Sequence, residues 1–226
     1  MPGTPPLGPA ALSRVLSQTH AARRAVTLLV LAVACAALSA LAAPPARAQA
    51  AAGCPFAAEV LGDAPPAAVE AAVSCLVNAE RAARGLVAVQ HAGALELSAR
   101  RHANDMVARG YFAHVSPTGG TVDKRARRAG YLSAPCWSLG EDLGSAPASV
   151  ASAQAVVDAW IESPGHRAVI LDPSFRDIGI ALVNRLPAGD AAGATFVLEM
   201  GAMIACERSG PRGAARATPR ARIRVS

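Results

Sequence analysis

The sequence predicts an α+β domain in which helices pack around a small antiparallel sheet. Two observations lead to this fold class. Helical patterns of apolar residues occupy most of residues 66–171, and two strand patterns, at 177–183 and 195–204, follow them. Strands that alternate with helices would instead indicate a doubly wound parallel sheet, so this order argues against that architecture. The chain also contains no internal repeat, phosphate-binding loop or nucleophile-elbow motif.

The helices are expected from apolar residues spaced three or four positions apart. In the first helix Val69, Val73 and Leu76 share one face, and Gly85 ends the pattern. Gly110 ends the second helix in the same way. The expected helical ranges are 66–84, about 92–109, 121–129, 150–160 and 164–171.

The last of these helices is very short and places His166 on its first turn. Ser163 is expected to cap it, Pro164 suits its first position, and Asp172-Pro173 ends it. The helix dipole disfavours an imidazolium at this position, so the ring is expected to be neutral. A neutral imidazole can bind a metal, accept a proton or simply pack.

Three segments are expected to be extended. Residues 136–144 carry Glu141 in a stretch flanked by Gly140 and Gly144, and glycines permit close approach of the backbone. Apolar residues alternate with small ones in 177–183, and 195–204 is mainly apolar. These last two segments are expected to pair and close the domain.

The N-terminus has the pattern of an export signal. Arg23 and Arg24 precede an almost purely apolar run, and small-residue cleavage sequences of the A-x-A type follow. An uncleaved membrane anchor is the alternative, because the run is nearly long enough to span a bilayer. The expected organisation is a signal peptide over 1–48, a loop with Cys54 over 49–65, the domain over 66–206 and a disordered, Arg-rich tail over 207–226.

The net charge of +6 comes from the two ends of the chain. Residues 1–48 hold four Arg and no acid, and residues 207–226 hold six Arg and one acid, which leaves 12 basic and 15 acidic residues between them. The domain is therefore not expected to bind nucleic acid, and we expect a monomer. The tail could meet an anionic wall polymer or a membrane, or have no partner.

Four cysteines remain after removal of a signal peptide, and an even number in an exported chain suggests two disulfides. Three connectivities are possible. Cys54 lies just before the first helix and Cys75 within it, so we expect them to pair. Cys136 would then pair with Cys206. No C-x-x-C motif or Cys/His cluster supports a thiol redox or structural zinc role.

The histidines that could carry chemistry lie beside turns. His114 precedes Ser116-Pro117, and His166 follows Ser163-Pro164-Gly165, whereas His91 and His102 are more readily read as structural or solvent-facing. Glu141 adds a carboxylate. Spacing alone does not bring these three side chains together, because 27 and 25 residues separate them.

Several motifs in succession resemble the CAP superfamily, which comprises cysteine-rich secretory proteins, antigen 5 and pathogenesis-related 1 proteins. The resemblance extends over about residues 72–204 and is closest to the bacterial, SCP-like extracellular branch. The most specific parts are "GYFAHVSP" and "AWIESPGHRAVIL". The matching segments are "VNAERAARGL" (77–86), "HANDMVARGYFAHVSP" (102–117), "GYLSAPCWSLGEDLG" (130–144), "VVDAWIESPGHRAVIL" (156–171) and "FRDIGIAL" (175–182).

This resemblance implies an α-β-α sandwich with a cleft that presents two histidines and one or two acids. His114 and His166 match the histidines, Glu141 matches the acid of the family's "GEN" motif, and Glu162 is the nearest match to a second acid. Asp142 stands where the motif usually has Asn. Two imidazoles and a carboxylate suit a divalent metal such as zinc, with His114 and His166 as ligands, or acid/base work.

Three functions follow, and we favour the first. The chain would be a secreted, non-enzymatic binding module at the cell envelope or outside the cell, and its cleft would hold a divalent metal, a small ligand, a lipid or a cell-wall component. It could instead be a metal-dependent hydrolase or peptidase, with the His/Glu set activating water or one of Ser116 and Ser163. The third alternative is a structural or interaction domain with a vestigial cleft. Proteins of this superfamily share no single reaction, so the fold cannot select one.

Overall fold

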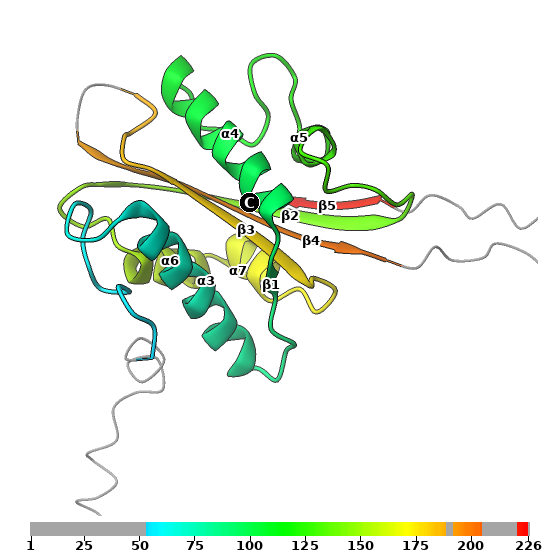
Figure 1. Cartoon of the computed structure of the whole chain (residues 1–226), viewed down its shortest axis with the longest axis horizontal. Helices are drawn as coiled ribbons and strands as arrows, with labels where there is room; N and C mark the ends of the chain where they lie inside the picture. Colours follow the sequence, from blue (N-terminus) through cyan, green and yellow to red (C-terminus); the bar gives the residue numbers. More distant parts are fainter. Residues whose placement is uncertain (1–52, 189–191, 205–220, 226) are drawn as a thin grey trace, which may run out of the picture. The chain divides into compact units, whose positions relative to one another are not determined.

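A five-stranded mixed sheet lies between two layers of helices in the computed structural model of the chain (Figure 1). The structure describes residues 53–188, 192–204 and 221–225, which all belong to one unit, Arg47–Ser226. The expected signal peptide over 1–48 lies outside these residues. Among the residues described, no helix is both long and apolar enough to cross a membrane.

The helices form where the apolar spacing predicts them. Three of them, α3, α6 and α7, cover one face of the sheet, and α4 and α5 cover the other (Figure 1). Ser152 caps α6, because its side chain accepts a hydrogen bond from the backbone N–H of Ala155. The helices are α3 (Pro66–Ala82), α4 (Gly93–Arg109), α5 (Val122–Arg128), α6 (Ala153–Glu162) and α7 (Pro164–Ile170).

The expected cap of α7 is confirmed in its position but not in its hydrogen bond. Ser163 occupies the N-cap position of α7, but its side chain makes no capping hydrogen bond. The same residue ends α6, where its backbone N–H donates to Ala159 O at 3.2 Å. Ser163 therefore joins two helices that follow each other directly.

The sheet is antiparallel at its centre and parallel at its edges. Its strand order is β1-β3-β4-β2-β5, with β4 antiparallel to both β3 and β2. The two edge strands, which the sequence patterns do not predict, run parallel to their neighbours. The strands are β1 (Gln90–His91), β2 (Trp137–Pro147), β3 (Asp177–Val183), β4 (Gly193–Met203) and β5 (Ala221–Val225).

The expected disorder of the tail over 207–226 is wrong for its last part, because Ala221–Val225 form β5. This strand pairs with Trp137–Glu141 of β2, and Arg224 Nε lies 2.7 Å from Asp172 Oδ2. Its alternation of Arg with Ile and Val suits an exposed edge strand. β2 continues beyond the residues that β5 covers, so its second half has no neighbour on this side within the described part of the chain.

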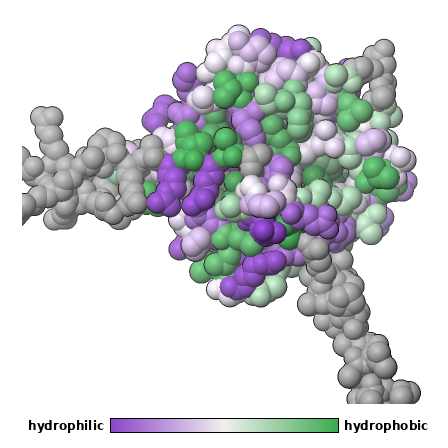
Figure 2. Space-filling view, turned by 180° about the vertical axis from the view of Figure 1, so that it is seen from behind, coloured by the Kyte–Doolittle hydropathy of each residue, from purple (hydrophilic) through white to green (hydrophobic). Residues whose placement is uncertain are grey.

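The main hydrophobic core lies on the α3/α6/α7 side of the sheet. On the other side α4 packs directly on β3, where a Cβ on Gly179 would lie 2.2 Å from the backbone nitrogen of Glu96. Only glycine allows this close approach. The face turned away from the viewer of Figure 1 carries apolar residues in separate patches between hydrophilic ones (Figure 2).

The disulfide expected between Cys54 and Cys75 is present and ties the N-terminal loop to α3. Cys136 is also disulfide-bonded. Its expected partner, Cys206, lies outside the described residues, so that pairing stays a prediction.

Candidate functional site

The carboxylate of Glu141 lies fully buried under α4 and α5. Successive residues of a strand point to opposite faces, and Leu139 and Leu143 belong to the clusters on the α4/α5 side. Glu141 therefore points to that side too. At the flanking glycines the side-chain position points to the other face of the sheet, because a Cβ on Gly140 or Gly144 would meet side chains of the α6/α7 layer.

Two side chains bind the Glu141 carboxylate. His114 Nδ1 lies 2.8 Å from Oε1, and Arg125 Nη2 donates to Oε2. Arg125, only 7% exposed, also donates from Nη1 to the carbonyl oxygens of His114 at 3.0 Å and Gly120 at 2.8 Å. One guanidinium thus fastens both ends of the 114–120 loop to the sheet.

Two further buried groups complete the cluster. His102 Nε2 donates to Ala113 O at 3.0 Å and lies 4.0 Å from Glu141 Oε1. Glu199 is the cross-strand partner of Glu141 on β4, and Ser98 Oγ donates to its Oε1 at 2.9 Å. We call Glu141, His114, Arg125, His102 and Glu199 the buried charge cluster.

The environment shifts the pKa values of the two acids in opposite directions. Burial alone would raise the pKa of Glu141, but the hydrogen bond to His114 and the charges of Arg125 and His102 outweigh it and lower that pKa. Burial and the charge of Glu141 raise the pKa of Glu199 well above its ordinary value. One acid is therefore ionised beside a second that favours its protonated form.

Burial is also the main cause that lowers the pKa of His102, against the charge of Glu141. The lowered pKa favours the neutral form of His102, whereas the Arg125 guanidinium keeps its positive charge beside Glu141. The cluster is then internally neutralised, and its clearest role is to hold the 111–121 loop and α5 against the sheet.

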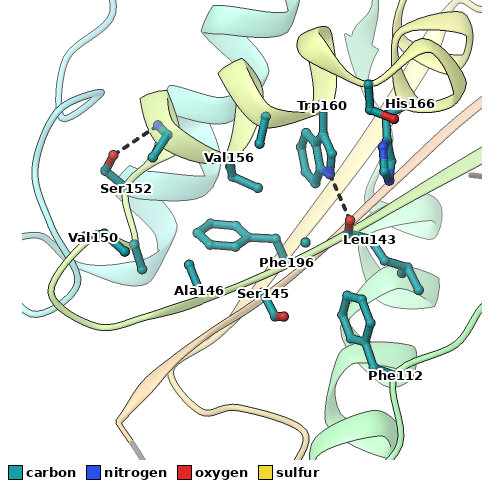
Figure 3. A pocket seen from close by; sticks show the side chains of 15 residues that line it. Phe112, Leu143, Ser145, Ala146, Val150, Ser152, Val156, Trp160, His166 and Phe196 are labelled. Atoms are coloured by element: carbon teal, nitrogen blue, oxygen red, sulfur yellow. Dashed lines mark hydrogen bonds between the residues drawn. The ribbon is translucent and has the colours of Figure 1, made fainter.

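A cavity of about 390 Å³ opens next to the cluster, at the uncovered edge of β2 (Figure 3). Trp160 of α6 forms one wall, and its Nε1 donates to Leu143 O at 2.9 Å. His166 of α7 and Phe112 of the loop before His114 complete the same end (Figure 3). The lining consists of Phe112, Leu143, Gly144, Ser145, Ala146, Val150, Ala151, Ser152, Ala155, Val156, Ala159, Trp160, Ser163, His166 and Phe196.

The model of the cysteine-rich secretory protein family, CAP, matches residues 76–196, more than half of the chain. The chain belongs to this family. Its match includes both histidines and the acid of the site. The CAP resemblance read from the sequence motifs is thereby confirmed, and so is the α+β fold class.

Three known proteins are similar to part of the chain. The uncharacterized protein YkwD of Bacillus subtilis is 37% identical over 113 residues, which is 48% of this chain and 40% of YkwD. An extracellular SCP-domain protein from Bacillus anthracis has a TM-score of 0.47 at 22% identity and covers 62% of this chain and 44% of its own. An outer surface protein from Borrelia burgdorferi has a TM-score of 0.49 at 19% identity, with 58% and 90% covered. The chain thus spans less than half of YkwD.

The CAP site residues have different surroundings. His114 and Glu141 are in direct contact in the buried charge cluster, whereas His166 is half-buried and lines the apolar cavity. Glu162, the expected second acid, is exposed at the end of α6 and is not among the residues that line the cavity. Asp142 is buried, and its neighbours Gly140 and Gly144 face the α6/α7 layer, as alternation along β2 requires for positions next to Glu141. The same alternation turns Asp142 to that side, away from Glu141.

Three members of the cluster were not predicted as site residues. His102 was interpreted as structural, although its face of the helix, with Ala99 and Met106, turns inward. Arg125 lies in a short basic helix that gave no reason to single it out. Glu199 left the clearest signal, because a lone acid between Leu198 and Met200 in a buried strand is unusual.

The predicted metal site gains no support from this arrangement. Within the described residues no group of three or more His, Cys, Asp or Glu side chains is placed to hold a metal ion. Glu141 is occupied by His114 and Arg125, and His166 lies in an apolar wall. The zinc binding by His114 and His166 that the resemblance implies is not tested by these observations, and no chemistry is assigned to it.

Proposed function

We propose that this CAP domain is a non-enzymatic binding module that takes a small ligand with an apolar body into the cavity at the β2 edge. The observation that carries the proposal is the cavity itself. Its volume of about 390 Å³ lies in the range of ~300–1,000 Å³ typical of small-molecule sites. Its walls are mostly aliphatic and aromatic, as in such sites.

The rim and the polar atoms of the cavity also suit a ligand that enters from solvent. Phe112 is 46% exposed and Val150 is 57% exposed although both line the cavity. Exposed apolar side chains at the mouth of a cavity favour capture of apolar groups. His166, Ser152 and Ser163 place a few polar groups along the wall, where they could orient a polar end of the ligand.

We place this activity outside the cell or at its envelope. The Cys54–Cys75 disulfide is typical of an oxidising compartment, and the N-terminal sequence has the pattern of an export signal. A lipid or a cell-wall component with an apolar part would be available there. The described part of the chain gives no reason to add a hydrolytic step.

The proposal can be tested by filling the cavity. Ala159 lines it on α6 and has an exposed side chain, so Ala159→Phe should block the cavity without disturbing the core. The probe is anilinonaphthalene sulfonate, displaced by decanoic acid, with the fluorescence of Trp160 as a second signal. We expect saturable binding by the natural chain and a loss of about tenfold or more in affinity in the variant.

Ala82→Phe is the matched control, because Ala82 is an exposed alanine at the end of α3 and does not line the cavity. It should bind the probe as the natural chain does. Equal binding by all three proteins would contradict the proposal, and so would an absence of saturable binding in the folded natural chain.

A further inference from the structure

A second, smaller cavity lies on the opposite side of the sheet, between α4, α5 and the loop that joins them. Its volume is about 220 Å³, and its lining is polar. Three arginines and two hydroxyl side chains contribute to it. The lining residues are Arg101, His102, Asp105, Ser116, Thr118, Arg125 and Arg128.

The charges around this cavity do not cancel. Glu141 neutralises Arg125, and Arg109 lies 3.3 Å from Asp105, whose other oxygen accepts a hydrogen bond from Tyr111. Neither Arg101 nor Arg128 makes an ion pair or a hydrogen bond within the part of the chain that the structure describes. Two guanidinium groups thus line the cavity without an ion-pair partner, since the one carboxylate in the lining, that of Asp105, is paired with Arg109.

The loop supplies hydroxyl groups beside one of these guanidiniums. Ser116 Oγ accepts a hydrogen bond from Gly120 N at 2.8 Å and lies 3.2 Å from Thr118 Oγ1. Two hydroxyls that contact each other can share only one hydrogen, so at least one hydroxyl hydrogen stays available to an acceptor. A Cβ on Gly120 would lie 2.7 Å from Ser116 Oγ and 3.6 Å from Arg128 Nη2, which places the Arg128 guanidinium near Ser116.

From this arrangement we propose that the cavity is a binding site for a phosphate group. Two unpaired guanidiniums offer up to ten N–H donors, in addition to the hydroxyls of Ser116 and Thr118. A carboxylate has two oxygens to receive them, whereas a phosphate presents three or four and binds arginine in a bidentate manner. The volume holds one such group with a few waters, at ~30 Å³ for each water.

The site is built on the buried charge cluster. Arg125 and His102 line the cavity and also contact Glu141, and Arg125 holds the carbonyl oxygens of His114 and Gly120. The cluster therefore fixes the loop that carries Ser116 and Thr118. The phosphate site does not depend on the apolar cavity, and either proposal can fail without the other.

The test is calorimetric titration of the full chain with inorganic phosphate at low ionic strength, where surface charges are least screened. The variant Arg101→Gln/Arg128→Gln removes the two unpaired charges and leaves the cluster intact. Arg127→Gln/Arg185→Gln is the matched control, because it removes two exposed arginines that do not line this cavity. We expect one phosphate per chain, a loss of about tenfold or more in the first variant, and little change in the control.

Equal losses in both variants would overturn the proposal, since they would show attraction by net charge alone. Acetate that binds as tightly as phosphate would overturn the assignment to a phosphate group. Binding to vesicles of phosphatidylglycerol or of phosphatidylcholine shows whether the phosphate group belongs to a lipid headgroup or to a soluble phosphate ester. Binding to the anionic vesicles that is lost in the first variant and kept in the control indicates a lipid headgroup, and phosphate binding without vesicle binding indicates a soluble phosphate ester.

Discussion

The two regions that meet along β2, the buried charge cluster and the apolar cavity, differ in polarity and in their access to solvent. On the α4/α5 side, each side chain of the buried charge cluster lies within about 4 Å of another member. At the free edge of the same strand, two residues further on, the apolar cavity is open to solvent. We infer from this difference that Glu141, the acid that matches the family motif, holds the 111–121 loop in place. The space for a ligand is the apolar cavity beside it.

The largest expected effect comes from removing the central charge of the cluster. Glu141→Gln removes the ionised carboxylate that pairs with the buried Arg125 guanidinium, and breaking a buried pair in this way typically lowers the free energy of unfolding by about 3–5 kcal/mol. The pKa of Glu141 is lowered in the folded state, so its contribution is present above the ordinary carboxyl pKa and is lost as the pH falls. Denaturant unfolding at pH 7 and pH 4 measures both effects.

Ala159→Phe provides the comparison from the cavity. The side chain of Ala159 is exposed, so this substitution should change the free energy of unfolding by no more than about 0.5 kcal/mol. If Glu141→Gln lowered the free energy of unfolding no more than Ala159→Phe does, the cluster would not hold the 111–121 loop and α5 against the sheet as we infer.

A smaller effect of opposite pH dependence is expected at Glu199. Its raised pKa means that the folded state keeps a proton that the unfolded chain releases above about pH 4.3, so this acid lowers stability as the pH rises. Gln resembles the protonated acid and can still accept the hydrogen bond from Ser98. Glu199→Gln should therefore match the natural chain near pH 4 and be the more stable of the two at pH 7.

The measurement is the midpoint of denaturant unfolding across this pH range. A variant that is less stable than the natural chain at every pH would show that Glu199 is ionised in the folded protein. The contrast between the two acids on neighbouring strands would then disappear.

The smallest effect is expected from zinc. Because no group of three or more metal ligands is placed together within the described residues, we expect calorimetric titration to show no stoichiometric zinc binding that His114→Ala/His166→Ala removes. Folding of both proteins is checked by circular dichroism. Tight binding in the natural chain that is absent from the double variant would instead establish a metal site and join the two regions.

Much of the fold could be predicted because it depends on the spacing of apolar residues and cysteines over short stretches of the chain. The spacing of Val69, Val73 and Leu76 defines α3, and the closeness of Cys54 to that helix is enough to suggest its disulfide with Cys75. The short edge strands could not be predicted in this way. β1 has only two residues, and β5 lies in an Arg-rich tail whose composition favours disorder.

The amino-acid sequence was enough to predict the family, the helices and the central strands, and the family resemblance implied that His114 and Glu141 share a site. Only the tertiary structure decided which groups neutralise Glu141. The pairing of β2 with β4 sets Glu199 opposite Glu141, and the packing of α5 brings in Arg125. The same packing puts His166 in an apolar wall, and among the described residues no strand pairs with the second half of β2 on the side of β5. These outcomes depend on strand register and on contacts between distant segments, which the local spacing of residues does not encode.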